Sequence, residues 1–379
     1  MRLLVLLFLA VTISAGEHNH PVGVTDGVAS LDVCADGKAI HQLTAVAKPM
    51  SPIEIHYRRS DDSGTTWKTA TIISTGMAPH KPNRTADIQI AAHGDQLLAA
   101  WSIAGTGFMG SGPLMTAISH DGGRSWSAGA NPADDNSMGG HNFVDLAVDG
   151  SGRFHAAWLD NRSGKQGLIY SNSDDGGRSW ATNQILDPTT CECCWNTLFA
   201  HGNQVHVLFR ASSPRDMRLF SSPNRGATFS PVTTVGAFNW NIQACPHVGG
   251  DLASNGTALH AVVWTGADSK TGVYHLHSQD HGATWSEPHP FPIPRARQVT
   301  VAAHRQRVIV CTTADDGSGN AIWLQCSNDH GQTWLLPERI SGIDTEVAHP
   351  KAVTTTEGIR IFWTQRVKDG AWTVEHYSL

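Results

Sequence analysis

The sequence predicts an all-β fold built from repeated units, arranged as a β-propeller or a solenoid. A short turn motif recurs at intervals of about 50 to 60 residues, a period typical of such repeat folds. The composition agrees, because 37 Gly and 13 Trp in 379 residues suit a protein rich in turns and short strands. Length alone would allow two or three domains, but a repeat array closes into a single body.

The repeated motif is Ser-x-Asp-x-Gly-x-Ser/Thr-Trp. Five copies follow it closely, at residues 60–67, 119–126, 173–180, 278–285 and 327–334. A sixth, degenerate copy at 222–229 has Asn for Asp and Phe for Trp. Ser and Asp side chains bond nearby backbone groups in tight turns, and Gly adopts backbone geometry that other residues resist. The motif therefore predicts a structural corner between two strands, with no catalytic role.

Alternating segments that end in an aromatic residue predict the second strand of each unit. These segments are residues 97–101, 154–158, 205–209, 259–264 and 359–363. A turn signal such as Asn255-Gly256 precedes each of them. Counting the units gives seven, with six as the alternative. The seventh, from about residue 346, has three predicted strands and ends before any turn motif. We expect its fourth strand from the residues that follow the N-terminal targeting segment, which would close the ring.

The turn motif is that of the Asp-box, or bacterial neuraminidase repeat, and residues 25–379 resemble the sialidase superfamily of β-propellers. The resemblance implies four-stranded antiparallel blades whose first strands line a central channel. It also implies that the Asp-boxes lie on one face and the channel mouth on the other. It is much less specific for activity, because one fold hosts many functions.

The N-terminus has the features of a signal peptide. A positive charge at Arg2 precedes the apolar run 3–13, and small residues follow at 14–16. We therefore expect a signal peptide at 1–16, a single propeller domain at 17–379, and a secreted or periplasmic protein. The apolar run is too short for a permanent membrane span, and no second one follows. A net charge of −6 without a basic run argues against a nucleic-acid partner.

A set of metal-ligand residues is predicted at the channel mouth. Aligning the repeats on their turn signals places His or Cys at the start of the channel-lining strand in four units, with further Cys nearby. The candidate ligands are His141, Cys191, Cys193, Cys194, Cys245, His247 and His349. Imidazole and thiolate together suit copper or zinc, and soft thiolates favour copper in its lower oxidation state. The sequence thus predicts a transition-metal site, with copper as the metal and zinc as the alternative.

Two other interpretations stay open for the cysteines. In an oxidising compartment, Cys191 or Cys194 could form a disulfide with Cys245 and staple neighbouring blades. The protein would then be a scaffold for a protein ligand, with histidines as polar channel lining. Cys311 and Cys326 lie on predicted hairpin neighbours and are either a cross-strand disulfide or small buried groups.

Sialidase chemistry makes demands that this sequence does not meet. The family's substrate-binding Arg motif before the first box is absent, and Tyr377-Ser378 falls in a third strand rather than at the channel. Arg84, Arg295 and Arg297 do lie at predicted mouth positions. Aspartates recur in the first strands of three units and are interpreted as a structural repeat feature. They are Asp87, Asp145 and Asp251. We expect a non-sialidase member of the superfamily, with a glycoside hydrolase or glycan-binding protein as the alternative. If the protein is an enzyme, the sequence favours glycoside hydrolysis or metal-dependent redox chemistry.

Overall fold

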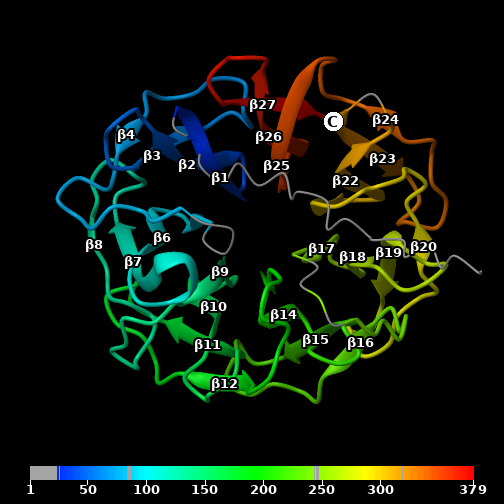
Figure 1. The fold of residues 1–379 in the computed structure, drawn as a ribbon, viewed down its shortest axis with the longest axis horizontal. Helices are drawn as coiled ribbons and strands as arrows, with labels where there is room; N and C mark the ends of the chain where they lie inside the picture. Colours follow the sequence, from blue (N-terminus) through cyan, green and yellow to red (C-terminus); the bar gives the residue numbers. More distant parts are fainter. Residues whose placement is uncertain (1–23, 25, 83–86, 243, 245–246, 318) are drawn as a thin grey trace, which may run out of the picture.

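Seven antiparallel sheets surround a central axis, so the protein is a seven-bladed β-propeller (Figure 1). The computed structural model describes residues 24, 26–82, 87–242, 244, 247–317 and 319–379. The preferred count of seven blades is therefore confirmed. Within each blade the strands follow chain order outward from the axis. No helix in the described ranges is long and apolar enough to cross a membrane.

The first four blades each have four strands. Blade one contains β1 (Gly27–Asp36), β2 (Ala39–Ala47), β3 (Glu54–Ser60) and β4 (Thr71–Ile72). Blade two contains β5 (Gln89–His93), β6 (Gln96–Ala104), β7 (Ser111–Ser119) and β8 (Ser127–Ala128). Blade three contains β9 (Asn142–Val148), β10 (Phe154–Asp160), β11 (Gly167–Ser173) and β12 (Gln184–Asp187). Blade four contains β13 (Thr197–His201), β14 (Gln204–Arg210), β15 (Met217–Ser222) and β16 (Thr233–Val235).

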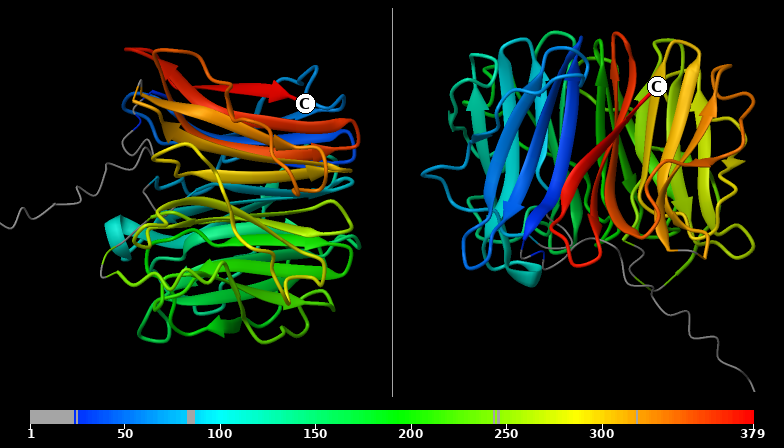
Figure 2. Two further views of the ribbon diagram at one scale, coloured as in Figure 1. Left: turned by 90° about the vertical axis from the view of Figure 1, so that its right-hand side faces the viewer. Right: turned by 90° about the horizontal axis from the view of Figure 1, so that it is seen from above.

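The remaining blades follow the same pattern until the last. Blade five contains β17 (Asp251–Ser254), β18 (Leu259–Thr265), β19 (Gly272–Ser278) and β20 (His289–Pro290). Blade six contains β21 (Val299–His304), β22 (Arg307–Asp315), β23 (Asn320–Ser327) and β24 (Glu338–Arg339). Blade seven contains β25 (Thr345–Thr355), β26 (Gly358–Val367) and β27 (Thr373–Ser378). A 3-10 turn, η1 (Phe108–Gly110), projects from one face as the cyan coil of Figure 2.

The seventh blade has three strands among the residues that the structure describes. The segment expected to supply its fourth strand, just after the targeting region, lies outside those residues. The ring closes where blade one meets blade seven. The amide of Val28 donates to the carbonyl of Trp372 at 2.9 Å, and Gly27 forms a parallel bridge to the same residue. Leu31 and Ile40 of blade one pack with Phe362 of blade seven.

Apolar side chains form the core between neighbouring blades rather than within one sheet. Leu43 and Ile55 of blade one pack with Ile90 and Trp101 of blade two. Trp101, the aromatic residue at the end of the predicted second-strand segment, is fully buried, as is Trp158 at the same place in blade three. Burial of this kind stabilises the fold by removing apolar surface from water. Each blade therefore needs its neighbours, as expected for a repeat fold.

The Asp-box is a turn closed by its own side chains, as predicted. In the first copy, Ser60 Oγ donates to Asp62 Oδ1 at 2.8 Å and accepts the Gly64 amide at 2.8 Å. Asp62 Oδ1 also accepts the amide of Thr66 at 2.8 Å. In the degenerate copy, Asn224 Oδ1 accepts the Thr228 amide at 2.9 Å. A side-chain amide oxygen therefore replaces the carboxylate without loss of the turn.

Candidate functional site

A cavity of about 640 Å³ lies on the propeller axis and is lined by residues from all seven blades. A cavity of this size suits a small-molecule ligand. Its wall contains Trp195, Arg297, His247 and His349, together with Lys351. The sequence prediction that His247 and His349 face the channel is therefore consistent with their places in the wall.

Aspartates of the innermost strands tie consecutive blades together around the cavity. Asp145 of blade three accepts the amide of Leu198 in blade four at 2.7 Å. Asp251 of blade five accepts the amide of Val301 in blade six at 2.9 Å and the hydroxyl of Thr300 at 2.7 Å. These bonds confirm the interpretation of the recurring aspartates as a structural repeat feature. Asp87, the third of them, instead accepts the indole N–H of Trp195 at 2.7 Å.

Two members of this polar ring, Asp32 and Lys351, are not among the residues predicted from the sequence. Asp32 accepts the Ile90 amide at 2.8 Å, and Lys351 Nζ lies 2.9 Å from its other oxygen. Burial raises the pKa of Asp32 and raises that of Asp145 to about 7. Burial alone would lower the pKa of Lys351, but the carboxylates of Asp32 and Asp145 outweigh it and raise that pKa. Asp32 was recoverable from the sequence, since it follows the same first-strand pattern.

One arginine at the cavity has no counter-charge among the residues that the structure describes. Arg295 pairs with Asp315 at 2.8 Å. The half-buried Arg297 guanidinium has no hydrogen bond or ion pair within the described ranges, and burial lowers its pKa. An unpaired, partly desolvated guanidinium beside a cavity is a site for an anion such as a carboxylate. Arg84, the third predicted mouth arginine, lies outside the described residues.

The backbone at the mouth is in an uncommon conformation. Arg295, His247 and His349 have φ values of 55°, 50° and 51°, in the left-handed region that non-glycine residues rarely occupy. His349 Nδ1 lies 3.0 Å from Thr364 Oγ1, which orients the ring. Strained backbone of this kind clusters at ligand-binding sites. Three of the sixteen non-glycine residues with positive φ among the described residues therefore lie at the mouth.

Three of the predicted metal ligands come together in the loop that leads from β12 to β13. Cys191 Sγ lies 3.6 Å from Cys193 Sγ and 3.4 Å from Cys194 Sγ. All three side chains are buried, all three thiols are free, and the three sulfurs lie within 4.8 Å of one another. We call these three side chains the thiol cluster. Cys245 lies outside the described residues.

Two arginines of blade four hold the thiol cluster in place. Arg215 Nη1 donates to Cys191 Sγ at 2.9 Å, and its Nε donates to the carbonyl of Ile242 at 3.1 Å. Arg210, fully buried, donates to the Arg215 carbonyl at 2.6 Å, and its own carbonyl accepts the Cys191 amide at 2.9 Å. Hydrogen bonds from Cys193 and Cys194, and then the charge of Arg215, lower the pKa of Cys191. The protein therefore favours negative charge on this sulfur.

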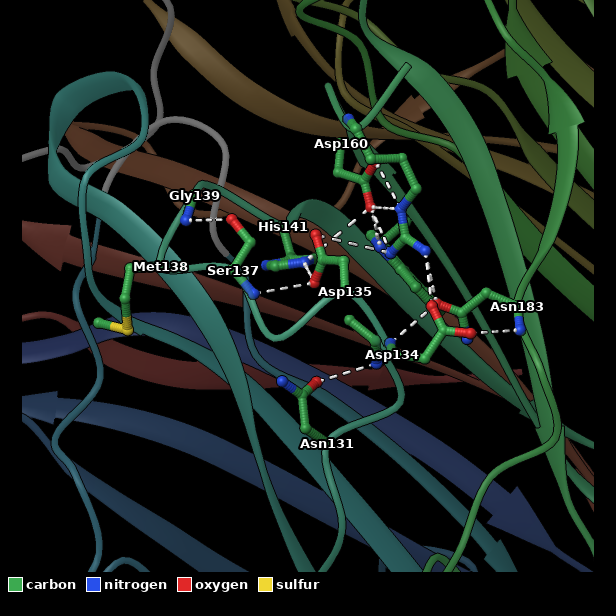
Figure 3. A network of polar contacts seen from close by, with 12 residues as sticks. Asn131, Asp134, Asp135, Ser137, Met138, Gly139, His141, Asp160 and Asn183 are labelled. Atoms are coloured by element: carbon green, nitrogen blue, oxygen red, sulfur yellow. Dashed lines mark hydrogen bonds and ion pairs between the residues drawn. The ribbon is translucent and has the colours of Figure 1, made fainter. Parts of the chain in front are cut away.

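His141 does not join the thiol cluster. Its Nε2 lies 3.0 Å from Asp135 Oδ1 and 4.0 Å from Asp160 Oδ2 (Figure 3). Arg162 pairs with both Asp160, at 2.8 Å, and Asp134, at 2.8 Å. Asp135, His141 and Asp160 form the second group of possible ligand atoms within 4.8 Å of one another among the described residues. Because Arg162 already supplies a cation, this group is best described as an ion-pair network.

The four predicted ligand positions thus separate into different surroundings. The structure unites Cys191, Cys193 and Cys194, holds His141 among carboxylates, and places His247 and His349 in the cavity wall. In the part of the chain that is described, neither histidine of the wall belongs to a group of three ligand atoms. Of the positions that share the predicted register, His247 and His349 line the cavity, whereas His141 and Cys193 do not. The register did not determine where their side chains point within the loops.

Comparison with known proteins identifies the repeat family and the fold. The family model for the BNR repeat-like domain matches residues 50–246, about half of the chain. The comparison with curated proteins gave no match.

Solved structures with the same architecture include carbohydrate-active enzymes. An ulvan lyase, described as a new family of polysaccharide lyase, has a TM-score of 0.60 at 9% identity, covering 94% of this chain and 95% of that one. An intramolecular trans-sialidase from Ruminococcus gnavus has a TM-score of 0.50 at 11% identity, covering 94% and 96%. A Hadza microbial sialidase has a TM-score of 0.47 at 15% identity, covering 76% of this chain and 64% of its own length. The likeness to the ulvan lyase and the trans-sialidase establishes the fold alone.

Proposed function

This chain belongs to the family of BNR repeat-like domains, in the sialidase superfamily of β-propellers, and we propose that it binds a soft transition metal at its thiol cluster. The metal is copper in its lower oxidation state, with zinc as the alternative. The observation that carries the proposal is the set of three buried, free sulfurs within 4.8 Å of one another. Because one fold can host many functions, the proposal is based on the residues of the site.

The sulfur spacing fits a shared ion. With metal–sulfur bonds of about 2.3 Å, two sulfurs of a tetrahedral site lie about 3.8 Å apart. The contacts of 3.4 and 3.6 Å around Cys191 are close to that value, so a metal would require only small shifts of the side chains. Thiolates select soft ions, above all copper in its lower oxidation state, and also zinc. Cys245 and His247, on the next connecting segment, are candidates for a further ligand.

The charge around the cluster supports ionised sulfurs. Buried charges are costly unless they are paired, and Arg215 presents its guanidinium directly to Cys191. A thiolate there compensates the arginine before a metal arrives. Metal binding then requires less proton release from this sulfur than from an ordinary thiol.

Titration of the reduced protein with copper(I), against a competing chelator of known affinity, tests the proposal. We expect one ion per chain in the wild type and a loss of affinity of at least about 100-fold in Cys193→Ser, because a ligand is removed. Cys311→Ser is the matched control, since Cys311 is fully buried in the core between blades six and seven. Equal affinity in Cys193→Ser and wild type would refute the site. A Cys245→Ser arm shows whether that residue is a ligand.

Arg297 supports a second candidate function, binding of an anionic glycan in the axial cavity. Its guanidinium, which has no partner among the described residues, lines a cavity of about 640 Å³ together with Trp195. Aromatic faces and forked donors together suit an acidic sugar. The structural neighbours include a polysaccharide lyase and an intramolecular trans-sialidase by their names. If the protein is an enzyme, its substrate would then be a glycan that carries a carboxylate.

Calorimetry with a uronic-acid oligosaccharide and its neutral counterpart tests this second candidate. We expect binding of the acidic sugar alone and a loss of about 10-fold or more in Arg297→Met. Arg305→Met is the control, because Arg305 is exposed in the turn between β21 and β22. Binding that is unchanged in Arg297→Met would exclude this use of the cavity. A fluorogenic sialoside assay separates sialic-acid chemistry from simple binding.

Export is part of the proposal. The predicted signal peptide, residues 1–16, lies outside the described residues, so its support remains the sequence pattern. We expect the mature protein to begin near residue 17, in the periplasm or outside the cell. Intact mass of the protein recovered from the exported fraction measures the cleavage point.

A further inference from the structure

The spacing of the thiol cluster gives it a second chemistry. Cys191 and Cys194 are separated by two residues, the spacing of dithiols that cycle between reduced and disulfide forms. Their sulfurs are 3.4 Å apart, whereas a disulfide bond is about 2.05 Å long. Closure therefore needs a movement of little more than 1 Å within one short turn.

We propose that a peroxide oxidises Cys191 and Cys194 to a disulfide and that this reaction switches off metal binding at the thiol cluster. The part that concerns metal release rests on the proposed function. The disulfide itself does not, because it needs only the two thiols and the oxidant.

The reaction balances with peroxide as the oxidant. The sulfur of Cys191 attacks one peroxide oxygen, the O–O bond breaks, and Cys191 becomes a sulfenic acid while one water leaves. The thiol of Cys194 then attacks that sulfur, the S–O bond breaks, and a second water leaves. Two thiols and one hydrogen peroxide give one disulfide and two waters. A small dithiol reductant reverses the change by thiol–disulfide exchange.

Geometry assigns the first step to Cys191. It is the sulfur that contacts both other thiols and the Arg215 guanidinium, at 2.9 Å. The cluster is buried, so a small oxidant such as peroxide can reach it more easily than a protein disulfide can. Cys311, by contrast, is fully buried in an apolar core with Ile309, Ile322 and Leu324.

Oxidation and metal binding exclude each other because they use the same sulfurs. A Cys191–Cys194 disulfide leaves only Cys193 as a thiol ligand of the cluster. A single thiol does not hold the ion as three do. By linkage, a bound metal protects the pair from oxidation to the same extent that oxidation expels the metal.

Peroxide treatment of the full reduced chain, with and without bound copper(I), tests the switch. In the metal-free arm we expect loss of two of the seven thiols and a mass decrease of about 2 Da, the mass of two hydrogens. Peptide mapping should show the Cys191–Cys194 link, and a reductant should restore both thiols. In the loaded arm we expect oxidation to be at least about 10-fold slower, because the metal occupies the sulfurs that must react with peroxide.

Two variants make the outcome specific. Cys193→Ser should still lose two thiols, because its reacting pair is intact, whereas Cys191→Ser should not. Added oxygen without a disulfide, or a link to Cys245 instead of Cys194, would overturn the switch. Equal copper binding before and after disulfide formation would also overturn it. If the reduced protein takes up no copper(I), the proposed function fails, and the metal-free arm still decides the disulfide.

Discussion

In five of the six Asp-boxes, the glycine is fixed by the preceding blade as well as by its own turn. Gly226 has φ of 76°, and a β-carbon there would overlap the hydroxyl of Tyr170 on the third strand of blade three. Gly123 stands in the same relation to Tyr57 of blade one. The motif therefore also forms a contact between blades. Because glycine has no side chain, the tyrosine ring of the preceding blade can approach the turn closely.

Replacing Gly226 with Ala should destabilise the protein through both effects. Ala is strained at positive φ, and its methyl group would force Tyr170 away from His155, whose Nδ1 lies 2.6 Å from the Tyr170 hydroxyl. We expect a loss of about 2 to 4 kcal/mol in the free energy of unfolding, measured in urea. Gly202→Ala is the control, because Gly202 has φ of 57° but open space around it. A loss no larger than that of the control would show that the contact with Tyr170 contributes nothing.

At the scale of single strands, a buried histidine recurs near the start of the second strand in blades one, three and five. His41 and His155 each direct Nδ1 to a tyrosine hydroxyl on the third strand, at 2.8 and 2.6 Å. In blade five the partner is another imidazole, and His260 Nδ1 lies 3.2 Å from His275 Nε2. Burial lowers the pKa of His260 to about 4 and that of His275 well below its ordinary value.

This pair makes blade five sensitive to acid. A histidine whose folded pKa lies below its unfolded value of 6.5 binds fewer protons when folded, so stability is full above that pH. Stability is lost as the pH falls from about 6.5 towards about 4, by up to about 3 kcal/mol for His260. Urea unfolding across this range should show the loss, and His275→Tyr, which copies blades one and three, should reduce it. His281→Tyr, at an exposed position, should leave the slope unchanged. An identical slope in His275→Tyr and wild type would contradict the assignment.

Elements and blades were predictable where the signal is local. The turn motif and the alternating second strands define six boxes and seven blades, because both depend on neighbouring residues. The direction of a loop side chain depends on its packing. His141 and Cys193 share a register, yet His141 turns to Asp135 while Cys193 turns to Cys191. Nothing in the local sequence of His141 shows that its ring lies near Asp160, at the end of β10.

At the scale of the whole molecule, opposite charges from separate blades stabilise the centre of the propeller. Three aspartates, from blades one, three and five, each bind the amide of the next blade. Lys351 of blade seven supplies the cation that balances Asp32, at 2.9 Å. No local pattern predicts this pairing, since the two residues are joined only when the ring closes. The ion pair between Asp32 and Lys351 therefore depends on closure of the complete ring.

Lys351→Met should weaken this centre most at neutral and alkaline pH. Without the ammonium group, the buried carboxylates of Asp32 and Asp145 are charged without compensation, which costs folding free energy. We expect a loss of about 2 to 3 kcal/mol in the free energy of unfolding at pH 7.5. This value is at the lower end for a broken buried pair, because 32% of the lysine side chain is exposed. Since burial raises the pKa of Asp145 to about 7, protonation removes part of that charge and the loss should shrink as the pH falls to about 5.5. Urea unfolding at both pH values measures the difference.

Lys38→Met, which removes an exposed pair with Glu357, should lower the free energy of unfolding little at either pH. A loss that is the same at both pH values would mean that the side chain acts by packing and not by its charge.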